Sequence, residues 1–126
     1  MTNLHLVLKK KWFDLILSGI KKEEYREIKP YWVNRLYRIT PANVYQFEDL
    51  EELSIELKKD YGYEVDAKFR PFTHITFQHG YSKSARRMTV ECQGIAIAEG
   101  NHDWGAEPGK RYFVIKLGEI LTTENI

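Results

Sequence analysis

The sequence is poor in cysteine and lacks long apolar runs. Cys92 is the only cysteine among 126 residues, so no disulfide can form within the chain and no cysteine-based zinc site can be assembled. Apolar and polar residues alternate around Cys92, and Cys92 lies at one of the apolar positions. We therefore expect a buried, unreactive thiol. No apolar stretch approaches the roughly 18 residues of a membrane span, and residues 1–6 carry no signal-peptide pattern. We therefore expect a cytoplasmic protein with no membrane partner.

The composition is that of a globular domain. Hydrophobic residues make up 43% of the chain and charged residues 29%, a balance that excludes a disordered tail protein. A chain of this length buries about two-thirds of its unfolded surface, so residues 1–126 are expected to form one domain. The four histidines show no metal-ligand spacing, and we expect no metal and no cofactor.

The net charge of +1 hides two basic stretches. Residues 1–38 carry nine Lys or Arg against four Asp or Glu, and residues 68–87 carry five basic residues and no acid. Either stretch alone is typical of a solvated surface. Two such stretches that met on one face would form a site for a polyanion.

The first third of the chain alternates short strands with short helices. Leu4–Leu8 predicts a strand, and Lys10–Ser18 has the spacing of an amphipathic helix that Gly19 would end. A polar strand is expected over Lys21–Glu27. A second helix is expected to begin at Pro30, because proline is favoured at the first helical position.

Helical periodicity predicts that two tryptophans lie in the core. It also predicts a third helix. Trp12 and Trp32 lie on the apolar stripes of the first two helices, so we expect both in the core. Residues 48–61 form an acidic helix that opens with the capping box Asp49–Glu52.

After residue 73 the hydrophobic period becomes two. Residues 74–78 and 86–98 are expected to be strands. In the second strand the apolar positions change from even-numbered to odd-numbered residues at Gln93–Gly94, where a β-bulge would turn the strand. Tyr112–Leu117 is the last expected strand. The pattern predicts an α+β fold, a small β-barrel of five to six mostly antiparallel strands with two to three helices around it.

A charged motif follows the first predicted helix. Gly19, Lys21, Glu24 and Arg26 form the pattern G-x-K-x-x-E-x-R directly after a strand and a glycine-capped helix. This pattern resembles the signature of the ASCH family. The likeness covers most of the chain apart from residues 48–61, and it also includes Gly80-Tyr81, the strand 86–98, Trp104-Gly105 and the closing segment 112–118.

ASCH domains are relatives of PUA domains, so the resemblance implies a PUA-like barrel with a cleft beside the motif. It also implies a role in binding RNA or a nucleotide-like ligand. Some small members are amidohydrolases that remove the acyl group of acetylated cytidine through the motif lysine, a threonine three residues later and a downstream glutamate. Lys21 matches that lysine, Glu24 stands in place of the threonine, and the second carboxylate has no assigned position. Whether the chain is an enzyme stays open.

The motif residues have both binding and structural interpretations. Glu24 and Arg26 share one face of the predicted strand, and neighbouring cations keep a carboxylate ionised. Glu24 would then accept a hydrogen bond from a base while Arg26 contacts phosphate; alternatively, the two form a structural ion pair. Lys21 would need a neutral amine to act as a base or nucleophile. Otherwise it binds phosphate or a carbonyl group.

A second group of candidates lies late in the chain. Tyr81, Lys83 and Arg86 combine an aromatic ring with cations, as single-stranded nucleic-acid sites do. Trp104 would be a second stacking platform or a lid over the barrel mouth. We therefore predict an RNA- or nucleotide-binding domain with these late residues opposite Lys21, Glu24 and Arg26. The alternatives are an amidohydrolase that acts on an acylated nucleoside through Lys21 and Glu24, and a regulatory interaction module without pocket chemistry.

Overall fold

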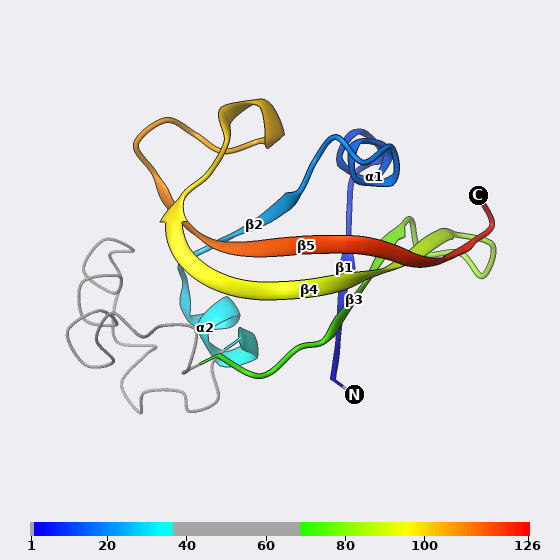
Figure 1. The fold of residues 1–126 in the computed structure, drawn as a ribbon, viewed down its shortest axis with the longest axis horizontal. Coiled ribbons are helices and arrows are strands. Elements are labelled where there is room, and N and C mark those ends of the chain that lie inside the picture. The colour runs from blue at the N-terminus through cyan, green and yellow to red at the C-terminus, as the bar shows by residue number, and fades with distance from the viewer. Residues whose placement is uncertain (1, 37–68) are drawn as a thin grey trace. The chain divides into compact units, whose positions relative to one another are not determined.

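A computed structural model describes residues 2–36 and 69–126. The described residues form five strands and two α-helices (Figure 1), which confirms the α+β class. The acidic helix expected over residues 48–61 lies outside the described residues. In the described ranges no helix is long and apolar enough to cross a membrane. In chain order the elements are β1 (Asn3–Val7), α1 (Lys10–Leu17), β2 (Glu23–Glu27), α2 (Pro30–Leu36), β3 (His74–His79), β4 (Arg86–Glu99), the 3-10 turn η2 (His102–Trp104) and β5 (Arg111–Glu124).

The five strands form one mixed sheet. Their order is β1-β3-β4-β5-β2. Strand β1 is parallel to β3, with Leu6 opposite Phe77, whereas β3 is antiparallel to β4, with Phe77 opposite Met88. These three side chains are buried, so the register aligns the apolar positions of three neighbouring strands.

Helix α1 ends as the sequence predicts. Its last residue is Leu17, and Gly19 follows with a φ of +82°, a conformation that costs glycine little. The N–H of Gly19 donates a hydrogen bond to the Ile16 carbonyl at 3.0 Å. Phe13 and Ile16 are the buried residues of the helix, so the apolar stripe faces the core and the lysines of its first turn face solvent.

The structure confirms that the buried positions of β4 change from even-numbered to odd-numbered residues. Met88 and Val90 are buried in the first half of the strand and Ile95 in the second, and Gly94 between them has a φ of +128°. Cys92 lies close to this change and is partly rather than fully buried, a correction to the prediction. Burial nevertheless raises the pKa of the Cys92 thiol above its usual value, which disfavours the reactive thiolate.

The two helix tryptophans are less buried than predicted. Trp12 and Trp32 are both partly exposed, and each ring has cations on its face. The Lys21 ammonium lies 4.5 Å from the centre of the Trp12 ring. The Arg26 guanidinium lies 5.0 Å from the centre of the Trp32 ring. A cation over an indole face is attracted by the ring, so both rings have a contact besides apolar packing.

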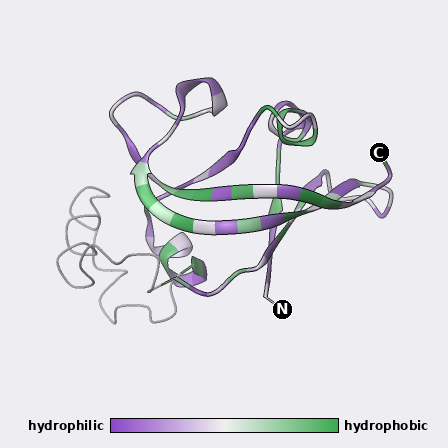
Figure 2. Cartoon of the chain, in the orientation of Figure 1, coloured by the Kyte–Doolittle hydropathy of each residue, from purple (hydrophilic) through white to green (hydrophobic). Residues whose placement is uncertain are grey.

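Strand β5 is longer than the sequence predicts. The expected strand ended at Leu117, but β5 continues to Glu124. Burial along the strand ends near Leu117, and most of the following side chains are exposed. Figure 2 shows the mixed hydropathy of β4 and β5. Because its last residues bury neither face, the end of β5 has no periodic signal in the sequence.

Contacts within the chain group into two compact units. The first comprises Met1–Glu24, Pro71–Gly94 and Ile115–Ile126, and the second comprises Tyr25–Arg70 and Ile95–Val114. The core of the first unit includes Phe13, Ile75, Phe77, Met88 and Val90. The core of the second unit includes Val33, Leu36, Phe69, Phe113 and Val114.

Candidate functional site

The motif lysine and glutamate form a buried ion pair. Lys21 Nζ lies 3.0 Å from Glu24 Oε1, and the side chains are 1% and 7% exposed. Lys21 sits in the turn between α1 and β2, where its N–H donates to the Leu15 carbonyl at 3.0 Å. Glu24 follows on β2. A buried charge is tolerated when an opposite charge lies beside it. The burial of each of these two charges therefore depends on the other.

The indole of Trp12 also contacts the Lys21 ammonium. The ring centre lies 4.5 Å from Lys21 Nζ, on helix α1. Cation–π contacts of desolvated ammonium groups contribute about 2 kcal/mol. The motif lysine therefore ties the start of β2 to α1, besides pairing with Glu24.

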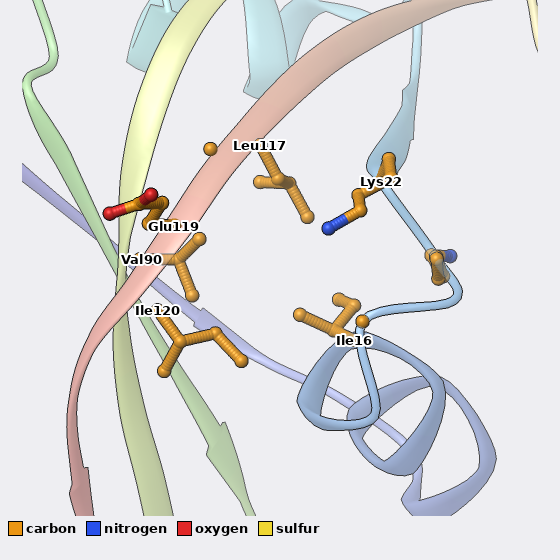
Figure 3. Close-up of a pocket in the computed structure, with 9 residues that line it drawn as sticks. Ile16, Lys22, Val90, Leu117, Glu119 and Ile120 are labelled. Atoms are coloured by element: carbon orange, nitrogen blue, oxygen red, sulfur yellow. The ribbon is translucent and has the colours of Figure 1, made fainter.

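A cavity of about 320 Å³ lies beside the motif, within the first unit. Helix α1, the turn after it, β4 and β5 all contribute to its wall (Figure 3). The lining residues are Ile16, Gly19, Lys21, Lys22, Val90, Leu117, Gly118, Glu119 and Ile120.

The Lys22 side chain faces the apolar part of this cavity. In Figure 3 the side-chain nitrogen of Lys22 extends between Leu117 and Ile16, whereas the carboxylate of Glu119 points away from them. The backbone of the turn is fixed because the Leu117 N–H donates to the Lys22 carbonyl at 2.9 Å. The site can therefore hold a small ligand with one negative charge beside an apolar group.

A carboxylate on α1 joins the two basic stretches of the sequence. Asp14 Oδ2 lies 2.7 Å from Lys10 Nζ, and Asp14 Oδ1 lies 2.8 Å from Arg86 Nη2. The contact between Arg86 Nη2 and Asp14 Oδ1 is a close ion pair. Its guanidinium also lies 4.6 Å from the centre of the Phe13 ring. The hydrogen bond from Lys10, and then the Arg86 cation, hold the pKa of Asp14 below its usual value.

The turn between β3 and β4 presents a tyrosine to solvent. Tyr81 is 87% exposed, and Lys83 in the same turn is exposed as well. Gln78 donates from Nε2 to the Gly80 carbonyl at 2.6 Å, and Arg87 donates from Nε to Gln78 Oε1 at 3.1 Å. Partly buried hydrogen bonds therefore hold the turn from beneath, while the Tyr81 ring stays exposed to a partner.

The other two predicted site residues belong to the second unit. Arg26 lies over the Trp32 ring, as does Arg35, at 5.5 Å. Trp104 is the last residue of η2, and its side chain is partly exposed. The structure therefore pairs Lys21 with Glu24 and places Arg86 on Asp14, as two separate contacts.

Sequence reasoning missed three residues of this region. The contact of Asp14 with Lys10 could have been predicted, because positions four apart meet on a helix. Its contact with Arg86 spans 72 residues and has no local signal. Trp12 was assigned to the core, and nothing local marks it as the ring beneath Lys21. Lys22 has no signal beyond its charge.

No family model matches this chain, and no curated protein or solved structure matches it either. Among residues 2–36 and 69–126, no three His, Cys, Asp or Glu side chains are grouped to hold a metal ion.

Proposed function

We propose that the chain is an ASCH-type, PUA-like domain, closed into a small barrel, that binds single-stranded RNA. The contact surface is the basic face of the first unit, defined as Lys9, Lys10, Lys11, Lys83 and Arg86 together with Tyr81. The observation that carries the proposal is the position of Asp14 between Lys10 and Arg86, at 2.7 and 2.8 Å. This contact is what makes two basic stretches, distant in sequence, one surface.

The charge of the basic face favours a polyanion. Lys9, Lys10, Lys11 and Lys83 are all exposed, and the one carboxylate described in contact with the face is shared between two of its cations. Exposed lysines that neutralise phosphates release condensed counterions, which supplies much of the affinity of nucleic-acid binding.

Tyr81 supports single-stranded rather than duplex RNA as the ligand. An unstacked base can lie on an exposed aromatic ring, and such stacking contributes about 1–3 kcal/mol per base. The bases of a duplex are already stacked on one another. The rigid turn beneath Tyr81 reduces the entropy lost when the ring is immobilised.

The motif residues Lys21 and Glu24 have a supporting role in this proposal. Their side chains are almost fully buried, so they are withdrawn from a phosphate backbone. The pair instead fixes α1 through Trp12, and α1 carries Lys10 and Asp14. We assign the pair to positioning the basic face rather than to contacting RNA.

Fluorescence anisotropy with a labelled single-stranded RNA oligonucleotide tests the proposal. The logarithm of affinity should fall linearly with the logarithm of salt concentration. Replacing Lys83 by alanine should reduce the slope by about 0.7, as expected for one lost contact to a single strand. The matched control is Lys116→Ala, which removes an exposed lysine of β5 and should leave the slope unchanged. Binding that is independent of salt would contradict the proposal.

Hydrolysis of an acylated nucleoside is a second candidate, favoured by one observation. Lys21 lines the cavity and is buried beside a carboxylate, an arrangement in which a proton can pass between amine and acid. The test is release of acetate from acetylated cytidine by the wild type, Lys21→Met and Glu24→Gln, with folding checked by circular dichroism. Turnover lost in both folded variants supports this candidate, and no turnover by the wild type rejects it.

A further inference from the structure

The cavity beside α1 has an apolar wall built from three elements of the first unit. Ile16 comes from α1, Val90 from β4, and Leu117 and Ile120 from β5. Ile16, Val90 and Leu117 are between 1% and 5% exposed, so their positions are fixed by the core. A volume of about 320 Å³ lies at the lower end of the range for small-molecule sites, roughly 300–1,000 Å³.

Lys22 supplies the charge of this cavity. Figure 3 shows its side-chain nitrogen reaching between Leu117 and Ile16, toward the apolar wall. The ion pairs described for residues 2–36 and 69–126 include none with Lys22. Its ammonium is therefore available to a ligand.

The remaining charges limit the ligand to a single negative charge. The Lys21 ammonium is already compensated by Glu24 at 3.0 Å. Glu119 lines the cavity with its carboxylate turned outward (Figure 3), and it would repel a second negative charge. Lysine is a point charge, whereas the fork of arginine matches phosphate.

We infer that this cavity binds a small amphipathic carboxylate. The carboxylate contacts the Lys22 ammonium, and a short hydrocarbon or aryl group lies against Ile16, Val90, Leu117 and Ile120. Burial of the apolar group drives binding, and the ion pair selects acids over neutral analogues. The inference does not rest on RNA binding, because Lys22 lies outside the basic face.

Titration with 4-phenylbutyrate, followed by ¹⁵N–¹H NMR of the full chain, tests the inference. The amide signals of Ile16, Lys22, Leu117 and Ile120 should shift with a single saturable curve. The neutral amide of the same acid should bind about tenfold more weakly, because it loses the charge-assisted contact. Butyrate, which lacks the aryl group, should also bind more weakly, and phenyl phosphate should gain nothing from its extra charge.

Two substitutions complete the test. Lys22→Met keeps the length of an exposed side chain and should reduce the affinity for 4-phenylbutyrate about tenfold, to that of the amide. Lys116→Met is the matched control, since Lys116 is an exposed lysine of β5 that does not line the cavity. The inference is overturned by equal affinity for acid and amide, by unchanged affinity in Lys22→Met, by tighter binding of phenyl phosphate, or by shifts confined to other residues. RNA affinity measured on Lys22→Met reports separately on the proposed function and should equal that of the wild type.

Discussion

Lys21 Nζ lies 3.0 Å from Glu24 Oε1, with both side chains almost fully buried. The pair spans one turn of chain and joins the end of the α1 region to β2. Since a buried charge without its partner is costly, this contact predicts how the fold responds when either charge is removed.

Replacing Lys21 by methionine should destabilise the protein by about 3–5 kcal/mol. The substitution preserves side-chain length but leaves the Glu24 carboxylate buried without its ammonium partner. Urea unfolding followed by circular dichroism gives the free energy of unfolding. The matched control is Lys10→Met, which breaks the exposed pair with Asp14 and should cost much less, because exposed ion pairs contribute little to stability. Equal losses in the two variants would show that the Lys21–Glu24 contact is not a buried pair in solution.

The stability of the protein should depend on pH through Asp14. Its pKa in the folded state is held below the usual 3.8, first by the Lys10 hydrogen bond and then by Arg86. A depressed pKa means that the folded state favours the carboxylate, so this stabilisation is complete above pH 3.8 and is lost as the pH falls through the folded-state pKa.

Thermal unfolding of the wild type and Asp14→Asn between pH 6 and pH 2 measures this contribution. The wild type should melt at the higher temperature near pH 6, and the difference should shrink below pH 3.8. A difference that stays constant down to pH 2 would exclude Asp14 as its source.

Gly118 should tolerate no side chain. A Cβ at this position would lie 2.9 Å from the Cβ of Glu91, 2.8 Å from Glu91 Oε2 and 2.9 Å from Gln93 Nε2. Gly118→Ala should therefore cost about 1–3 kcal/mol of unfolding free energy through overpacking. Adding Glu91→Ala should recover only part of the loss, because alanine retains the Cβ that causes one of the contacts. Full recovery in the double variant would show that the flexible carboxylate alone is responsible.

Local patterns in the sequence were sufficient to predict several elements. The apolar spacing and Gly19 predicted α1, Pro30 predicted the start of α2, and the parity change at Gly94 was visible as a shift in alternation. These features depend on residues a few positions apart. The end of β5 could not be predicted in this way, because its final residues are exposed and carry no alternation.

Contacts between distant residues could not be predicted in the same way. Asp14 meets Arg86 only because β4 begins beside α1, and Lys21 meets Trp12 only because the turn after α1 folds back on it. The motif predicted that Lys21 and Glu24 act together, but their degree of burial depends on the packing of the whole unit. The positions of the charged residues follow from the sequence, but which of them face solvent depends on the fold.

The exposed ring of Tyr81 provides the most direct test of RNA binding by the basic face. Affinity for a single-stranded RNA oligonucleotide should fall about tenfold in Tyr81→Ala, because stacking of one base is lost, and should be nearly unchanged in Tyr81→Phe, which keeps the ring. Both variants should unfold like the wild type, since the side chain is 87% exposed. Wild-type affinity in Tyr81→Ala, or an equal loss in Tyr81→Phe, would contradict the account.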